Sequence, residues 1–271
     1  TGLIFTGQRE VQNYSASLDY RLQDLTTATM NYNYETDHYN LPGYTDWWNQ
    51  STSLELDHDL SQWVRATKGF ISFGYDHYHF ESNPVDNYTG ILGFKYDYNE
   101  KWSLLMDGGP CFTQAKFMVQ RLTMVPPFFF FIQNEEQTSK GWGSIAQITM
   151  MYKDEYTTAN VSVNKSIMPG ISGATDRTVV NLGLQYRFTY ELQGLLNGGY
   201  YLNKSDPGQY SIQGINYQTL LTSLGLRYEF SKDVYLETSY GYAKTQDRNN
   251  DTIAERNLYS IKFYVQHSLF E

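Results

Sequence analysis

The sequence contains a single cysteine, Cys111, among its 271 residues. One cysteine can form neither an internal disulfide nor a cysteine metal cluster, and because no CxxCH motif is present the chain does not itself attach c-type haem. Basic residues are also scarce, with 20 Lys and Arg against 29 Asp and Glu and a net charge of −9. Because phosphate binding requires a basic surface, nucleic acid is not an expected partner.

Long apolar runs are missing as well. No segment approaches the roughly 20 apolar residues that a membrane helix needs, which excludes a helical membrane protein. No signal peptide is visible at Thr1-Gly2-Leu3. We expect either numbering that begins after cleavage or a chain that lacks an N-terminal part, because residues 1–6 read like the end of a strand.

Aromatic residues are abundant. They make up 17% of the chain and include 25 tyrosines. Such a composition suits the aromatic girdles that flank the apolar band of a transmembrane β-barrel. A tyrosine-rich extracellular β-protein is the alternative that composition alone leaves open.

The last segment, 258–270, shows the pattern that organises the chain. Every second residue is apolar or aromatic, as in Tyr259, Ile261 and Phe263, and the residues between are mostly polar, such as Ser260 and Lys262. A period of two indicates a strand with one apolar and one polar face. Thirteen segments carry this pattern.

Short turns alternate with longer polar loops between these segments. Residues 99–101 and 231–233 are typical turns, whereas 169–177 and 203–216 are expected to be loops. The sequence therefore predicts an all-β, antiparallel up-and-down transmembrane β-barrel with short periplasmic turns and long extracellular loops. Because bacterial barrels usually have an even number of strands, a further strand at 3–6 gives about 14, within a range of 12–16.

Residues 1–271 are expected to form one barrel domain with an irregular middle. Gly108-Gly109-Pro110 should break a strand, since proline cannot donate to a ladder and glycine weakens it. Pro126-Pro127 follows in the same region. The segment 108–141 is therefore predicted to be an irregular excursion or loop.

The carboxy-terminal half carries three barrel-like motifs. They are Val180-Asn181-Leu182-Gly183-Leu184-Gln185-Tyr186-Arg187-Phe188, Leu224-Gly225-Leu226-Arg227-Tyr228-Glu229-Phe230, and Ser239-Tyr240-Gly241-Tyr242. This half resembles outer-membrane β-barrels of the β-barrel porin 2 type, some of which are associated with exopolysaccharide export. The resemblance implies a bacterial outer-membrane location. The terminal segment also resembles the β-signal that the barrel-assembly machinery reads, which usually ends in an aromatic residue, and so implies recognition by that machinery. The chain departs from this signal because Glu271 follows Phe270.

The alternation assigns ionisable side chains to the polar face. The predicted pore-lining residues are Asp19, Arg21, Glu55, Asp57, Asp76, Lys95, Asp97, Asp107, Arg187, Arg227, Glu229, Glu237 and Lys262. The amino-terminal half of this wall is mainly acidic and the carboxy-terminal half mainly basic. One hypothesis is a transverse field across a selective pore, and the other is that paired charges fill and stiffen a small barrel.

The apolar face carries aromatic residues near strand ends. The predicted membrane-interface aromatics are Tyr20, Tyr32, Tyr96, Trp102, Tyr152, Tyr186, Tyr228 and Phe230. Their amphipathic rings suit the boundary between lipid and water. The lipid bilayer is therefore an expected partner.

No catalytic or metal centre is predicted. His77 and His79 share a strand face, but the spacing suggests no third ligand. No nucleophile motif such as GxSxG is present, so neither enzyme activity nor a cofactor is expected. Three functions remain open: a Gram-negative porin-like channel for polar solutes or saccharides, a polysaccharide-export barrel with a periplasmic partner, and a sheath around a lumen-inserted protein such as an electron-transfer cytochrome.

Overall fold

The computed structural model describes residues 9–39, 46–80, 84–125, 129–170, 173–205 and 214–265. All regular structure in these ranges is β-strand. The strands are β1 (Arg9–Gln23), β2 (Thr26–Tyr39), β3 (Trp47–Asp59), β4 (Thr67–Phe80), β5 (Val85–Asp97), β6 (Trp102–Val125), β7 (Phe129–Lys153), β8 (Thr157–Gly170), β9 (Gly173–Arg187), β10 (Leu192–Ser205), β11 (Ile215–Ser231), β12 (Val234–Asp247) and β13 (Thr252–Val265). The expected strand at 3–6 and the chain beyond Val265 lie outside the described residues.

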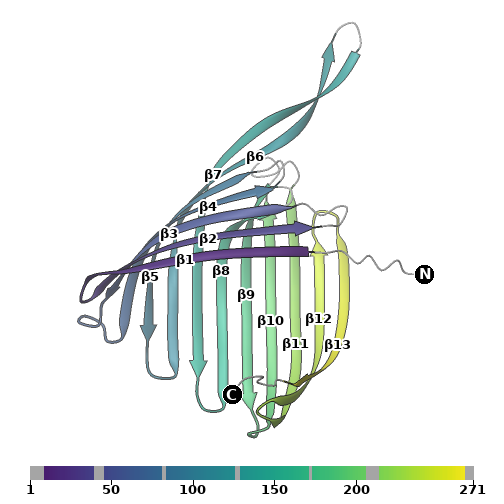
Figure 1. Cartoon of the computed structure of the whole chain (residues 1–271). Helices are drawn as coiled ribbons and strands as arrows, with labels where there is room; N and C mark the ends of the chain where they lie inside the picture. Colours follow the sequence, from purple (N-terminus) through teal and green to yellow (C-terminus); the bar gives the residue numbers. More distant parts are fainter. Residues whose placement is uncertain are drawn as a thin grey trace.

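The strands form one antiparallel sheet in sequence order, from β1 to β13. Figure 1 shows this sheet curving round, with β6 and β7 projecting beyond the ends of their neighbours. Among the described residues β1 and β13 do not pair with each other, so the sheet has two open edges. The described ranges contain no helix long and apolar enough to cross a membrane. The predicted all-β, up-and-down architecture and its thirteen patterned strands are confirmed.

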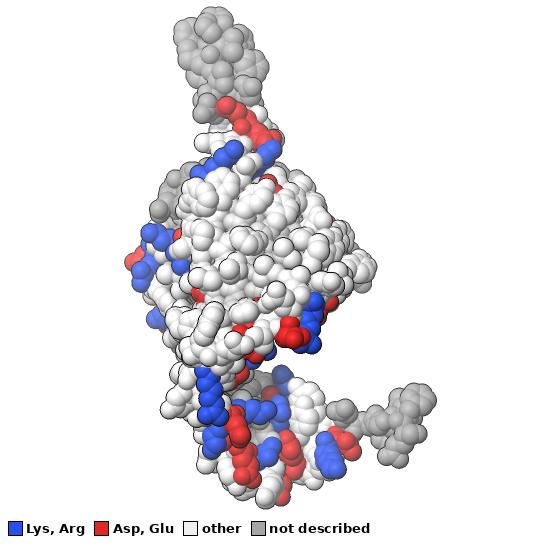
Figure 2. All heavy atoms as spheres, turned by 90° about the vertical axis from the view of Figure 1, so that its left-hand side faces the viewer, with Lys and Arg blue, Asp and Glu red and all other residues white. Residues whose placement is uncertain are grey.

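Strand pairing gives the sheet two chemically different faces. Residues paired side by side on successive strands form a row across the sheet. In the row that runs from Leu184 through Leu196 and Leu224 to Tyr259, every residue is apolar or aromatic and at least a third exposed. We call this side the apolar face and the opposite side the polar face. Figure 2 shows a broad area without charged side chains, bordered by charged residues. An exposed apolar band of this extent is the form that lipid contact requires.

The prediction of an irregular excursion at 108–141 differs from the structure. Pro110 lies within β6 and is paired with Ser144 of β7. Toward β5 the ladder skips this point, passing from Thr89↔Cys111 to Leu92↔Gly108. The missing proline N–H therefore falls in a gap of the ladder. Gly109 allows close approach there, because a Cβ on it would lie 1.8 Å from the carbonyl oxygen of Gly90.

The expected loop at 169–177 is also mostly strand. β8 runs to Gly170 and β9 begins at Gly173, and these two residues are paired. Polar composition and two glycines indicated a loop, but pairing between the two arms overrides that local signal.

The turn between β7 and β8 is organised by Asp154. Its carboxylate accepts hydrogen bonds from the Thr157 N–H at 2.6 Å, the Tyr156 N–H at 2.9 Å and the Tyr152 hydroxyl at 2.5 Å. The Tyr152 hydrogen bond and the backbone donors lower the pKa of Asp154. All three donors favour the charged form, so the turn is set by a carboxylate.

Replacing Asp154 with alanine should therefore lower the urea midpoint of unfolding. Because the folded-state pKa is depressed, the stabilisation is fully present above the ordinary carboxyl pKa of about 4 and is lost as the pH falls through the folded value. Urea unfolding of the two proteins at pH 7 and pH 3 measures the difference. Glu155→Ala, which removes the neighbouring carboxylate, is the matched control, and an equal loss in both variants would contradict the role of Asp154.

Candidate functional site

The residues predicted to line a pore share the polar face. Strand pairing places all thirteen on the polar face. Asp57, for example, pairs with Phe70 on that face, and Arg227 pairs with Glu237. The eight predicted interface aromatics lie on the apolar face. Several form ring contacts near the short turns, with centroid separations of 4.7 Å for Trp102 and Tyr152 and 4.9 Å for Tyr228 and Phe230.

A second group of aromatic residues crosses the apolar face further from the short turns. The row through Tyr32 continues to Tyr75, Tyr88, Phe112 and Trp142. Ring centroids are 5.0 Å apart for Tyr75 and Tyr88 and 5.1 Å apart for Phe112 and Trp142. Two aromatic belts on one face match the two interfaces of a bilayer.

Acidic side chains gather on the polar face of β3 to β6. Asp57 and Asp107 occupy one row, separated by Phe70 of β4 and Gly93 of β5. Glu55 interacts electrostatically with both carboxylates. We call Glu55, Asp57 and Asp107 the acidic group. Like charges on one stretch of wall raise the local concentration of counter-cations.

Other predicted acidic residues have local partners. Asp19 accepts a hydrogen bond of 2.7 Å from Thr29, and Asp97 lies 4.0 Å from the Lys95 ammonium. Arg21 turns toward Asp24 at 3.0 Å, where both side chains are well exposed. Exposed pairs of this kind contribute little to stability.

The charges of the carboxy-terminal half lie close to the short turns. Arg187 belongs to the row of Arg227, Glu237 and Lys262. Two guanidinium nitrogens of Arg227 donate to Glu237, at 2.7 and 3.2 Å. The basic residues of the expected half-wall therefore lie in one row, and the Glu237 carboxylate lies in the same row.

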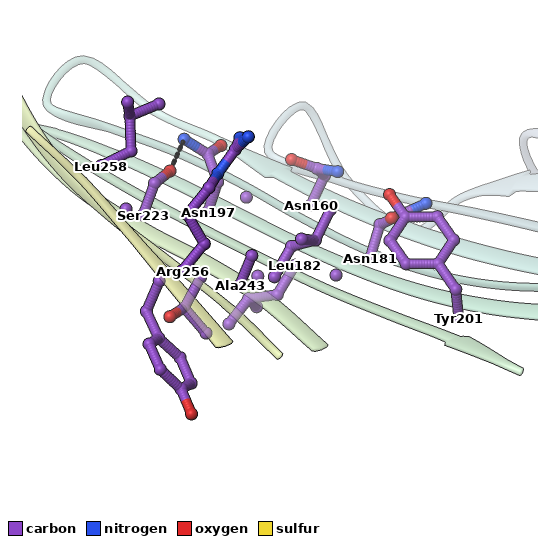
Figure 3. Close-up of a pocket in the computed structure, with 16 residues that line it drawn as sticks. Asn160, Asn181, Leu182, Asn197, Tyr201, Ser223, Ala243, Arg256 and Leu258 are labelled. Carbon is purple, nitrogen blue, oxygen red and sulfur yellow. Dashed lines mark hydrogen bonds between the residues drawn. The ribbon is translucent and has the colours of Figure 1, made fainter. Parts of the chain in front are cut away.

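A stretch of wall rich in asparagine lies above that row. Asn160, Asn181 and Asn197 project from the same side of the sheet (Figure 3), and the Asn197 amide donates to the Ser223 hydroxyl at 3.3 Å. These residues border an open hollow of about 440 Å³ that Tyr201 and Arg256 also line. We call it the amide wall.

Sequence reasoning missed the amide wall because it searched the polar face for ionisable groups only. The same alternation that assigned Arg187 to the polar face also assigns Asn160, Asn181 and Asn197 to it. Asparagine offers both donors and acceptors, so this surface can hydrogen-bond neutral polar solutes.

The histidine pair lies on the apolar face. His77 bonds to the Asp86 carboxylate at 2.7 Å and its ring lies 5.0 Å from that of Trp48. Within the described ranges, no group of three or more His, Cys, Asp or Glu residues could hold a metal ion.

Comparison with known proteins gives structural likeness only. No family model and no curated protein matches the sequence. The fold is similar to the copper transporter OprC, with a TM-score of 0.56, 11% identity, and coverage of 89% of this chain and 48% of that one. It is also similar to the ferric yersiniabactin uptake receptor FyuA from Yersinia pestis (TM-score 0.54, 10% identity, 90% and 44% covered) and to the siderophore receptor PiuA from Acinetobacter baumannii (0.51, 12%, 92% and 49%). The chain therefore spans about half the length of these proteins and has the strand architecture of outer-membrane β-barrels.

Proposed function

We propose that this chain forms the wall of an outer-membrane channel for polar solutes in a Gram-negative bacterium. The supporting observation is the separation of the two faces, with aromatic belts on one side and most of the charged and polar strand residues on the other. A polar face of this length fits a water-filled lumen, because in lipid only an internally paired sheet with apolar side chains outward is stable. The likeness to solved outer-membrane β-barrels supports the same assignment, whereas no family model confirms the β-barrel porin 2 type.

The distribution of charge suggests which solutes pass. The acidic group favours cations, whereas Arg227 is held by Glu237 near the short turns. The amide wall offers hydrogen bonds to neutral polar solutes, saccharides included. We therefore infer a channel that prefers cations and neutral polar molecules over anions.

The channel should show its charge preference in a planar bilayer. We expect ohmic conductance and a cation-selective reversal potential across a KCl gradient. Removing the acidic group with Glu55→Gln, Asp57→Asn and Asp107→Asn should move that potential toward zero, because the counter-cations lose their attraction to the wall. Replacing three turn carboxylates with Glu100→Gln, Glu155→Gln and Asp233→Asn is the matched control and should leave the potential unchanged.

The same recordings separate the alternatives. An absence of conductance in the isolated chain, together with a protein bound inside the sheet, would favour a sheath around a partner. A reversal potential that is unchanged by the three substitutions in the acidic group would contradict the inferred preference for cations. Outer-membrane insertion by the barrel-assembly machinery is part of the proposal, and depletion of that machinery should leave the chain unfolded.

A further inference from the structure

The upper end of β8 leaves the wall and crosses the polar face. β7 and β8 pair only as far as Ala146↔Lys165, whereas β7 stays paired with β6 to Val125↔Phe129. β8 nevertheless remains paired with β9 up to Gly170↔Gly173. We call residues 166–170, with their partners 173–177 on β9, the β8 tip. Above Lys165 the tip no longer pairs with β7 in the ladder.

The contacts of Ile167 show where the tip goes. Its side chain is 5% exposed and packs with Val85, Cys111 and Ala115, which are 0–1% exposed. These three residues come from β5 and β6, and strand pairing places all of them on the polar face. The β8 tip therefore lies as a second layer over the inside of the neighbouring wall.

Hydrogen bonds hold the tip at the same point. The Asn87 amide of β5 donates to the Ile167 carbonyl oxygen at 3.4 Å, 80 residues away in sequence. The Thr113 hydroxyl donates to the Asn87 oxygen at 2.8 Å and so orients that amide. Asn87 and Thr113 are 2% and 0% exposed. We call Ile167 and the Asn87 bond the latch.

The space under the latch is fitted to one side chain. A Cβ built on Gly143 of β7 would lie 2.6 Å from Ile167 Cδ1. Only a residue without a side chain leaves room at this position. The inner wall is therefore shaped to receive Ile167.

We propose that the β8 tip is the constriction of the channel and that release of the latch widens the passage. This inference rests on the proposed channel function. The tip occupies the interior beside β5 to β7 and leaves the passage between itself and the other strands. Release of the latch breaks the Ile167 packing and one long hydrogen bond while the β8–β9 pairing stays intact, so the tip opens at a lower cost than the whole sheet unfolds.

Cys111 provides a natural probe of the latch. It is the only cysteine, its side chain is 1% exposed, and it packs against Ile167. Because Cys111 is 1% exposed beneath Ile167, a water-soluble methanethiosulfonate reagent should reach this thiol from the interior much faster when the tip lifts. We expect slow labelling of the wild-type chain and, for Ile167→Ala, acceleration on the order of 30-fold, because truncating a buried isoleucine removes most of its packing.

Two further variants keep the test independent of misfolding. Gly143→Ala crowds Ile167 from the β7 side and should also accelerate labelling without shortening any side chain of β8. Val163→Ala truncates an apolar-face residue of the same strand and should leave the rate unchanged. Heat-shifted gel migration checks that each variant folds. The latch is overturned if neither Ile167→Ala nor Gly143→Ala accelerates labelling, or if Val163→Ala accelerates it equally.

Liposome swelling with neutral sugars of increasing size tests the constriction. Ile167→Ala should admit larger sugars than the wild type, and Val163→Ala should not. Faster labelling of Cys111 with an unchanged size limit would overturn the constriction. If neither the wild type nor any variant passes a solute while Cys111 labelling changes as expected, the proposed channel function is wrong but the latch is supported.

Discussion

Replacing Leu224 with arginine should strongly destabilise the folded chain in a lipid bilayer. Leu224 lies near the middle of β11 with 60% of its side chain exposed, between Leu196 and Tyr240 on the apolar face. Arginine at the bilayer midplane of a β-barrel costs about 2–4 kcal/mol. That cost lowers the folding equilibrium constant by roughly 30- to 1,000-fold. Urea unfolding in phospholipid vesicles measures it directly.

The neighbouring residue gives a matched control. Ser223 has the same depth in the same strand but lies on the polar face, where its hydroxyl accepts from Asn197. Ser223→Arg introduces the same side chain into the interior and should cost no more than the lost hydrogen bond, about 1 kcal/mol. Equal destabilisation by the two substitutions would show that both faces contact the same solvent, which would contradict the prediction.

The fold was predictable because its main signal is local. A period of two runs through most strands, and Tyr259, Ile261 and Phe263 lie on the face that alternation assigns to them. The predictions at 108–141 and 169–177 differ from the structure for a common reason, which is that glycine and proline indicate a break only when the partner strand is not considered. The gap in the β5–β6 ladder shows where the missing N–H of Pro110 falls.

The interior was less predictable because its contacts join residues far apart in sequence. Asn87 meets the carbonyl of Ile167 across 80 positions, and no pattern in either segment indicates the other. The acidic side chains of β3 and β6 were assigned to the correct face by alternation alone. Their approach to one another depends on the pairing of four strands, which fixes Asp57 and Asp107 on one row.

The two open edges restrict how the sheet can close. In an up-and-down sheet all odd-numbered strands run in the same direction, so β1 and β13 are parallel to each other. Both edges carry large exposed residues on the apolar face, such as Leu18 and Ile261, at 67% and 78% exposure. Backbone groups left unpaired in lipid are costly, so these edges must be covered. Antiparallel closure requires an odd number of further strands between them, and a second copy in the same orientation cannot supply it because its edges run in that same direction.

Spin labels across the seam should therefore report a gap of at least one strand. In a Cys111→Ser background, we place one label at Ser260 of β13 and scan the other along the polar face of β1, at Ser15, Ser17 and Asp19. The smallest separation should equal or exceed that of a reference pair at Gly225 and Ser260, which lie two strands apart at about 10 Å. A match instead to a reference pair at Ser239 and Ser260, whose hydroxyls are 2.7 Å apart on adjacent strands, would mean direct parallel closure. Such a result would remove the need for a further strand, since the parallel pair would itself satisfy both edges.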